Sequence, residues 1–403
     1  MIQVEKILQE ICPDGVEYKK IKDAFVRLKG TPITAGKMKE IDNPDGEIKV
    51  FAGGKTVINA TEKDIPNANI TRVPAVLVQS RGVIDFIYYD KPFTFKNEMW
   101  AYTADNEITV KFLYYLLKND VEYFRDSASG MGALPQISLG ITEDYEVPLP
   151  PLAAQREIVH VLDKFTLLSS ELAAELAARK EQYEYYRDSL LTFSDDVPMV
   201  KLGELCSLVT KQTGFDYSNH IKDSLIMEEK EGTVPYIQTK FFTGKTFNYN
   251  TDYYVPQEIV NRFPKITLDS KCLLFSIVGA SIGNVGLFPN ERTCFLGGAI
   301  CVAKVKPEYN IEYLYYCIEA KDVQRQIRKK TKGAGQATIT VEDIREFSIP
   351  LPPIEVQNEI VRLLNSFSSL CNDITTGLPA EIEARQKQYE YYRDKLLTFK
   401  KLS

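Results

Sequence analysis

The heptapeptide Gln182-Tyr-Glu-Tyr-Tyr-Arg-Asp188 occurs a second time, unchanged, as Gln388-Tyr-Glu-Tyr-Tyr-Arg-Asp394. The similarity continues on both sides of this string. The matching pairs are Val147-Pro-Leu-Pro-Pro151 with Ile349-Pro-Leu-Pro-Pro353, Gln155-Arg-Glu-Ile-Val159 with Gln357-Asn-Glu-Ile-Val361, and Leu190-Leu-Thr-Phe193 with Leu396-Leu-Thr-Phe399. The chain therefore contains two copies of one plan, and we expect a molecule with internal pseudo-twofold symmetry.

Each copy contains a long helical segment, at about 152–194 and 354–400. Apolar residues recur there at steps of three and four, which is typical of one stripe along a helix. In the first copy they are Ile158, Leu162, Phe165, Leu168, Leu172, Leu176, Tyr183, Tyr186, Leu190 and Phe193. A helix of this length cannot bury its own stripe. We therefore predict that the two helices pack antiparallel as a coiled coil.

The two helical segments differ in length. Phe165 and Phe367 are 202 residues apart, whereas Tyr183 and Tyr389 are 206 residues apart, so the second copy has four extra residues. They lie ahead of Gly377-Leu-Pro379, where proline is predicted to break or restart the helix. The first copy has instead the tandem tetrapeptide Glu171-Leu-Ala-Ala-Glu-Leu-Ala-Ala178, which consists of strong helix formers.

The remaining sequence is a mixture of short strands, turns and helices. Apolar runs of strand length include 48–51, 73–78, 234–237 and 272–278, and glycines punctuate them. The fold class expected is α/β (α+β). We divide the chain into recognition-type domains at 1–148 and 195–350 and helical segments at 149–194 and 351–403. The ends of the two mixed segments match in sequence and their middles do not, which leaves the middles free to differ in specificity.

Composition excludes several classes of protein. The 403 residues carry a formal net charge of −6, and no apolar run is long enough to span a membrane. Seven scattered cysteines and only two histidines argue against a zinc site and favour a reducing cytoplasm. Gly54-Lys-Thr56 and Gly244-Lys-Thr246 lack the earlier glycine of a phosphate-binding loop. We therefore predict no catalytic residue, metal or cofactor in this chain.

The repeated frame resembles the specificity subunits of Type I restriction-modification systems. The resemblance covers essentially the whole chain. It is carried by the two Pro-Leu-Pro-Pro junctions followed by Gln-x-Glu-Ile-Val, by the two Tyr-Glu-Tyr-Tyr-Arg-Asp-x-Leu-Leu-x-Phe endings, and by Cys12-Pro-Asp-Gly-Val-Glu-Tyr18. The insertion at Gly377-Leu-Pro379 departs from a single straight helix.

This resemblance implies a non-catalytic subunit that recognises double-stranded DNA. Each of two target-recognition domains would read one half of a bipartite, asymmetric sequence. The helices would act as a spacer and dock two modification subunits, and a restriction subunit would join that core. S-adenosylmethionine and, for restriction, ATP and Mg²⁺ are expected on those partner subunits.

Candidate DNA contacts are polar residues on predicted loops and the basic segment Arg325-Gln-Ile-Arg-Lys-Lys-Thr-Lys332, which suits phosphate contact. The alternative for the basic segment is a solvated helix end, where cations are favourable. The full set comprises Arg325, Arg328, Lys329, Lys330, Lys332, Gln336, Ser127, Ser129, Gln136, Lys55, Thr56, Gln79, Arg81, Gln238, Lys240, Lys245, Ser281 and Asn284.

The tyrosine clusters favour helix packing or subunit docking over base stacking, because they recur at helical spacing inside the repeated frame. The candidates are Tyr183, Tyr186, Arg187, Tyr389, Tyr392 and Arg393. Other functions stay open: the specificity partner of a related system that cleaves near its site, a coiled-coil scaffold without DNA contact, or a stand-alone enzyme. The last is disfavoured because no complete catalytic motif is present.

Overall fold

The computed structural model describes residues 10–54, 56–129, 134–333, 337–372 and 378–402. The chain divides into two compact units. Unit 1 comprises Met1–Ala173 and Glu381–Ser403, and unit 2 comprises Ala174–Ala380. Each unit therefore combines one mixed α/β segment with part of each helical segment.

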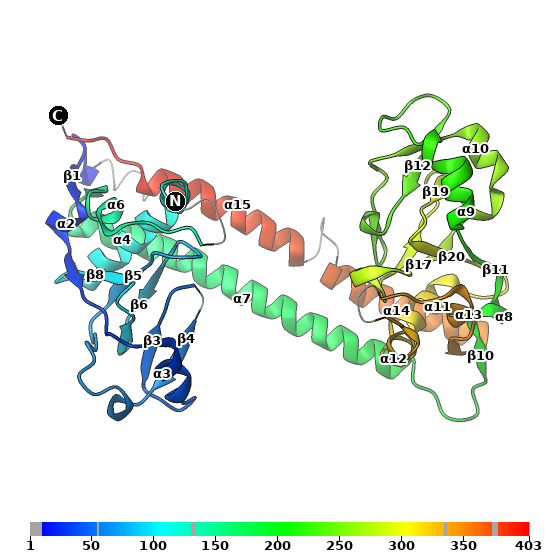
Figure 1. The fold of residues 1–403 in the computed structure, drawn as a ribbon, viewed down its shortest axis with the longest axis horizontal. Coiled ribbons are helices and arrows are strands. Elements are labelled where there is room, and N and C mark those ends of the chain that lie inside the picture. The colour runs from blue at the N-terminus through cyan, green and yellow to red at the C-terminus, as the bar shows by residue number, and fades with distance from the viewer. Residues whose placement is uncertain (1–9, 55, 130–133, 334–336, 373–377, 403) are drawn as a thin grey trace. The chain divides into compact units, whose positions relative to one another are not determined.

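Unit 1 has three sheets. A four-stranded antiparallel sheet has the order β2-β8-β5-β6, a three-stranded sheet has the order β4-β3-β7, and β1 pairs with β9 (Figure 1). The strands are β1 Glu17–Lys20, β2 Val26–Leu28, β3 Ile48–Phe51, β4 Val57–Ala60, β5 Ala75–Gln79, β6 Asp85–Tyr89, β7 Phe93–Phe95, β8 Trp100–Thr103 and β9 Glu146–Leu149.

Helix α4 covers the four-stranded sheet of unit 1, because its apolar face meets the buried residues of β5 and β6. Its Phe112 and Leu113 share one core with Val76, Val78 and the helix residue Leu162. The helices of this unit outside the long segments are α2 Ile21–Ala24, α3 Ala35–Glu40, α4 Glu107–Asn119, α5 Val121–Asp126, α6 Leu139–Glu143 and the 3₁₀ turn η1 Glu62–Asp64.

Unit 2 has two four-stranded sheets, ordered β11-β20-β17-β18 and β15-β12-β19-β16, and the pairs β10-β21 and β13-β14. The strands are β10 Met199–Lys201, β11 Cys206–Lys211, β12 Thr233–Ile237, β13 Phe242–Thr243, β14 Thr246–Phe247, β15 Tyr254–Pro256, β16 Thr267–Leu268, β17 Cys272–Ser276, β18 Val285–Phe288, β19 Cys294–Leu296, β20 Ile300–Val305 and β21 Ser348–Pro350. The helices are α8 Leu202–Leu205, α9 Gly214–Asp216, α10 Gln257–Arg262, α11 Ile311–Glu319, α12 Lys321–Lys330, α13 Val341–Arg345, the π-helix η2 Tyr217–Ile221, and the 3₁₀ turns η3 Lys222–Ser224, η4 Thr239–Phe241, η5 Pro264–Ile266 and η6 Gly279–Ser281.

The two mixed segments share one strand plan although their middles differ in sequence. The order β2-β8-β5-β6 in unit 1 matches β11-β20-β17-β18 in unit 2. The second sheets also match, since β3 pairs antiparallel with β4 and parallel with β7, as β12 does with β15 and β19. Unit 2 adds β16 and the β13-β14 hairpin. The prediction of two α/β domains is confirmed, and the repeat extends into segments where no sequence match showed it.

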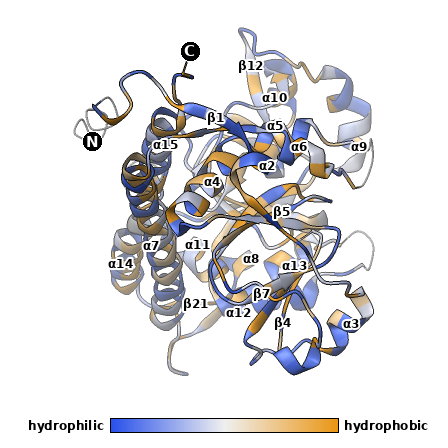
Figure 2. Ribbon diagram, turned by 90° about the vertical axis from the view of Figure 1, so that its left-hand side faces the viewer, coloured by the Kyte–Doolittle hydropathy of each residue, from blue (hydrophilic) through white to orange (hydrophobic). Residues whose placement is uncertain are grey.

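The first helical segment is one continuous helix, α7 Leu152–Leu190 (Figure 1). Residues 152–173 of α7 belong to unit 1 and residues 174–190 to unit 2. At about 1.5 Å per residue a helix of 39 residues is roughly 58 Å long. Both hydrophilic and hydrophobic residues occur on α7 (Figure 2), as expected of an amphipathic helix.

The second helical segment forms two helices, α14 Ile354–Asn372 in unit 2 and α15 Leu378–Leu397, which lies almost entirely in unit 1. Pro379 is the second residue of α15. In the first turn of a helix a backbone N–H has no intrahelical acceptor, so a proline there costs no hydrogen bond. A break or restart of the helix at this proline stays a prediction. Gly377 lies outside the described residues.

In each unit two of these helices pack against each other. In unit 1 Phe165 of α7 contacts Tyr392 of α15, and the earlier α7 residue Leu162 shares a core with the later α15 residues Leu396 and Leu397. The two helices therefore run in opposite directions, as predicted. Unit 2 repeats the arrangement with α7 and α14, through the contact of Tyr186 with Phe367.

Candidate nucleic-acid interface

Three sequence-distant loops of unit 1 meet where strand β5 ends. The backbone N–H of Ile137 donates to the Ser80 carbonyl at 3.0 Å, and that of Gly82 donates to the Pro135 carbonyl at 2.8 Å. The Gln79 side chain reaches the Gly54 carbonyl at 2.7 Å, so the turn after β3 joins the same edge. We call the described residues 53, 54, 56, 79–82, 129 and 134–136 the loop edge of unit 1.

The predicted contact residues of unit 1 fall on this loop edge, with one exception. Thr56, Arg81, Ser129 and Gln136 are exposed there, whereas Gln79 is buried and holds the turn after β3. Ser129 and Gln136 exchange two backbone hydrogen bonds at 2.9 and 3.0 Å. The exception, Ser127, closes the end of α5 by donating to the Tyr123 carbonyl. Lys55 lies outside the described residues.

Unit 2 builds an equivalent edge from the turn after β17 and the paired residues Lys332 and Thr338. Gly279 N–H donates to the Ala337 carbonyl at 2.9 Å, and Ile339 N–H donates to the Ile277 carbonyl at 3.1 Å. Ser281 and Asn284 lie on the turn between β17 and β18, where Asn284 N–H donates to the Ser281 carbonyl. We call the described residues 277–284, 332, 333, 337 and 338 the loop edge of unit 2. The predicted contact Gln336 lies outside the described residues.

Helix α12 places the basic segment next to the loop edge of unit 2. Its apolar face is fixed by the buried Val323 and Ile327, and Gln326 exchanges hydrogen bonds with the backbone of Ser348. The charged side chains therefore lie on the outer face.

Ion pairs divide these cations into two groups. Arg325 is paired with Asp322 at 3.0 Å, and Lys330 is 3.7 Å from Asp343. A hydrogen bond from Thr340 and the nearby Lys330 hold the pKa of Asp343 below its usual value. Arg328, Lys329 and Lys332 are paired with no acid among the described residues. These three are the cations available for phosphate.

The remaining predicted contacts of unit 2 lie after β12. Gln238 is half-buried, and exposed Lys240 forms an ion pair with Asp252. Lys245 instead points to helix α11, where its ammonium is 2.8 Å from a Glu312 carboxylate oxygen. DNA contact by any of these residues stays a prediction.

The tyrosine clusters pack helices. Tyr183 and Tyr389 lie beneath the guanidinium groups of Arg187 and Arg393, at 5.8 and 5.7 Å from the ring centroids. Each arginine also binds the aspartate that follows it, Asp188 or Asp394. The two copies of the heptapeptide thus have the same internal contacts.

The exposed aromatic residues of the heptapeptide were missed by the sequence-based prediction. Tyr185 is 66% exposed and its counterpart Tyr391 is 54% exposed. The signal in the sequence was that the two heptapeptides are identical at all seven positions. Packing constrains only the inward face of a helix, so identity on the outward face as well indicates that something binds there.

The model of the family described as the Type I restriction modification DNA specificity domain matches residues 13–179 and 194–384. The chain belongs to this family. The specificity subunit of the Type I restriction enzymes EcoR124I and EcoR124II of Escherichia coli is 31% identical over 377 residues, covering 88% of this chain and 87% of that protein. The EcoprrI specificity subunit of the same species is 29% identical over 277 residues, covering 66% and 63%.

Solved structures share the fold of this specificity subunit. The crystal structure of a Type I S subunit from M. genitalium superposes with a TM-score of 0.60 at 16% identity, covering 95% of this chain and 96% of that one. A second chain, from a structural study of assembly and conformational transition of the type I R-M system, gives 0.58 at 14% identity, covering 96% and 98%. The two mixed segments are therefore the two target-recognition domains of a Type I specificity subunit.

The described residues also bear on membrane and metal sites. No described helix is both long and apolar enough to cross a membrane. Within the same residues, no group of histidine, cysteine, aspartate and glutamate side chains is arranged to hold a metal ion.

Proposed function

We propose that this chain is the DNA-reading, non-catalytic subunit of a Type I restriction-modification complex. Each recognition domain binds one half of a bipartite, asymmetric target in double-stranded DNA through its loop edge. The observation that carries the proposal is the shared strand plan of the two units, which presents different loop sequences at equivalent places. A common scaffold with divergent loops is how folds vary their specificity.

The two domains differ in how they would hold DNA. The loop edge of unit 2 adjoins Arg328, Lys329 and Lys332, whereas the corresponding helix of unit 1, α5, contains the sequence Val-Glu-Tyr-Phe-Arg-Asp with one cation. Salt-dependent phosphate contact therefore belongs mainly to the second domain. The first domain relies more on polar groups such as Arg81, Ser129 and Gln136.

The partners are two modification subunits, which dock on the two copies of the heptapeptide, and a restriction subunit. The exposed tyrosines Tyr185 and Tyr391 support this, because identical outward faces suit two copies of one partner. S-adenosylmethionine, ATP and Mg²⁺ belong to these partners, which methylate adenine and cleave DNA. In this proposal α7 and the α14–α15 segment serve as the spacer between half-sites.

The test is a genome-wide map of N6-methyladenine by single-molecule sequencing, with the gene intact and deleted. The proposal expects methylation of one bipartite motif to vanish on deletion. If modification subunits are co-expressed and no bipartite motif depends on this chain, the proposal is wrong, and the coiled-coil scaffold without DNA contact becomes the better account.

A domain exchange tests the division of labour. Replacing residues 20–147 by the corresponding segment of another specificity subunit should change one half of the methylated motif and leave the other half intact. A change in both halves would contradict independent reading. Mapping cleavage positions relative to the motif separates this function from a related system that cuts near its site.

A further inference from the structure

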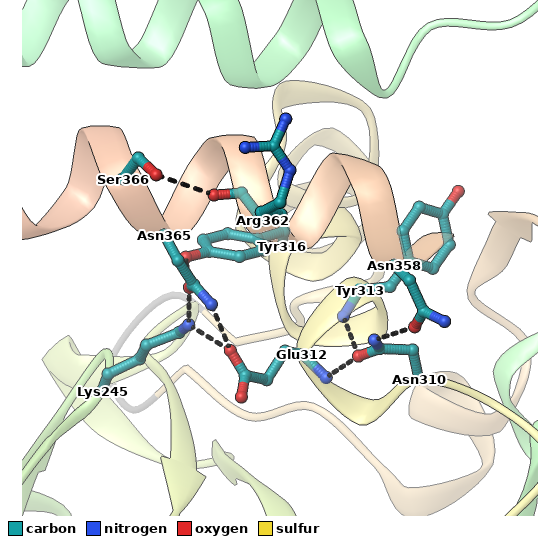
Figure 3. Close-up of polar contacts among 9 residues, drawn as sticks. All are labelled: Lys245, Asn310, Glu312, Tyr313, Tyr316, Asn358, Arg362, Asn365 and Ser366. Carbon is teal, nitrogen blue, oxygen red and sulfur yellow. Dashed lines mark hydrogen bonds and ion pairs between the residues drawn. The ribbon is translucent and has the colours of Figure 1, made fainter. Parts of the chain in front are cut away.

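Lys245 sits where the second recognition domain meets its helices. It follows Gly244 at the tip of the hairpin formed by β13 and β14, and Figure 3 shows its side chain reaching toward α11 and α14. The Nζ atom is 2.8 Å from Glu312 Oε2 and 2.5 Å from Asn365 Oδ1. It also lies 4.5 Å from the centroid of the Tyr316 ring. The ammonium thus has favourable partners on two helices.

The acceptors of Lys245 are themselves connected. Asn365 donates from Nδ2 to Glu312 Oε2 at 3.0 Å, and the Tyr316 hydroxyl donates to Asn365 Oδ1 at 2.6 Å. Burial pushes the pKa of Glu312 up, but the hydrogen bonds from Lys245 and Asn365 outweigh burial and the pKa lies below its usual value. The carboxylate is therefore held ionised opposite the ammonium.

Unit 1 contains the same junction with a different distribution of charge. By the repeat, Lys111 corresponds to Glu312, Tyr115 to Tyr316, and Asp163 to Asn365. Tyr115 donates to Asp163 Oδ1 at 2.6 Å, as Tyr316 does to Asn365, and Lys111 Nζ is 2.7 Å from Asp163 Oδ2. In unit 1 both charges come from the frame helices α4 and α7.

In unit 2 the frame supplies only the acid, Glu312, because the position of Asp163 is taken by a neutral asparagine. The cation comes from the hairpin, which has no counterpart among the described residues of unit 1. A hairpin that completes a charge pair on the helices is coupled to them. This is a feature of the second recognition domain alone.

The β13-β14 hairpin is hydrogen-bonded to strand β18, which begins at the loop edge of unit 2. Gly244 N–H donates to the Val285 carbonyl at 3.2 Å, and Leu287 N–H donates to the Gly244 carbonyl at 3.0 Å. Asn284, a predicted DNA contact, directly precedes β18, and it lines the same cavity of about 730 Å³ as Lys245. The position of the Lys245 side chain therefore affects the position of the turn that contains Ser281 and Asn284.

We infer that Lys245 is a positioning residue rather than a phosphate contact: through Glu312, Asn365 and Tyr316 it fixes the recognition turn of the second domain on helices α11 and α14. The role in DNA reading rests on the proposed function. The positioning role itself rests on the contacts within unit 2 and can be measured without DNA.

The experiment compares Lys245→Met, Glu312→Gln and the double variant of the full chain. The matched control for the unfolding measurement alone is Lys240→Met, an exposed lysine of the same domain whose partner Asp252 belongs to a loop. Thermal unfolding is measured for each chain alone. Affinity is measured for each chain assembled with modification subunits, on a duplex carrying the mapped target and on one with the second half-site scrambled, over a series of salt concentrations.

A positioning role predicts that both single variants lower the unfolding midpoint and that the double variant loses less than the sum, since the two residues share one interaction. Both should weaken binding to the target duplex by about two- to fivefold, the range of a partly exposed ion pair, with an unchanged salt slope. Lys240→Met should leave the unfolding midpoint unchanged.

Two results overturn the inference. In one, Lys245→Met lowers the slope of log affinity against log salt by about 0.9 while Glu312→Gln does not weaken binding, which is the signature of a phosphate contact. In the other, the unfolding midpoint of Lys245→Met equals that of the control. The same conclusion follows if the double variant lowers the midpoint by the full sum of the two single variants. If the wild-type complex fails to distinguish the duplexes, the proposed function is wrong, and the unfolding data still decide the positioning role.

Discussion

Tyr186 of α7 stacks on Phe367 of α14, with ring centroids 5.4 Å apart and ring planes 19° from parallel. The repeat equivalents of these residues, Tyr392 and Phe165, stack in the same way at 5.9 Å and 21°. In one unit the tyrosine comes from α7 and the phenylalanine from the second helical segment, and in the other unit these sources are reversed. A reciprocal contact of this kind is expected when each helix of a twofold repeat packs on its counterpart.

Removing either tyrosine of these stacked pairs should destabilise its unit. Tyr186→Ala and Tyr392→Ala are each expected to lower the free energy of unfolding by about 1–3 kcal/mol, since partly buried area and an aromatic pair are lost together. Urea unfolding of the full chain measures the loss. The matched controls Tyr185→Ala and Tyr391→Ala change exposed rings and should stay within about 0.5 kcal/mol of wild type. Equal losses in all four variants would contradict the packing role.

The exposed tyrosines should matter for assembly instead. Tyr185→Ala and Tyr391→Ala should each weaken binding of one modification subunit, and the double variant should weaken both. We expect a loss of about 2 kcal/mol per site, typical of an aromatic anchor at an interface. Native mass spectrometry of the co-expressed complex reads the stoichiometry. Undiminished assembly of the double variant would show that the partner binds elsewhere.

Cations on α12 should govern the salt dependence of DNA binding. Arg328→Gln and Lys329→Gln should each reduce the slope of log affinity against log salt by about 0.9 and weaken target and scrambled duplexes alike. Lys321→Gln, on the same helix but paired with Asp188 at 3.2 Å, is the control and should change the slope less. Slopes that match wild type in both test variants would favour the solvated helix end.

Lengthening the tetrapeptide of α7 should lengthen the gap between half-sites. Inserting Glu-Leu-Ala-Ala after Ala178 adds four helical residues, or about 6 Å, close to two base pairs of DNA. The methylation map should then show both half-sites unchanged and a longer unspecified spacer. An unaltered spacer would show that the length of α7 does not set the distance between the half-sites.

The stability of unit 2 should depend on the protonation of Glu319. Burial raises the pKa of this carboxyl, with Arg187 opposing the shift. At neutral pH the folded state therefore carries an unfavourable charge, which disappears as pH falls through the raised pKa. Glu319→Gln should be more stable than wild type at pH 7, and this advantage should vanish below about pH 4.3, the ordinary value for glutamate.

Thermal unfolding between pH 4 and 7 measures the difference between wild type and Glu319→Gln. The control is Glu231→Gln, an exposed loop carboxylate of the same unit, which should show no such trend. An advantage of Glu319→Gln that stays constant with pH would mean that the gain comes from packing or hydrogen bonding rather than from removal of a charge.

The amino-acid sequence by itself determined the two-copy plan, the long helices and the family. Each of these is written in a contiguous stretch, because helix periodicity and proline act over a few residues. The spacing of Tyr186 and Arg187 predicted helix packing or subunit docking and did not choose between them.

Only the tertiary structure decided the common strand order of the two domains, the meeting of Arg81 with Gln136, and the place of Lys245. Strand order depends on pairings between distant residues, and no local period encodes them. Lys245 resembled a loop lysine in sequence, but its partners Glu312 and Asn365 are 67 and 120 residues away. Because an ion pair forms wherever folding brings the charges together, its role became visible only in the folded chain.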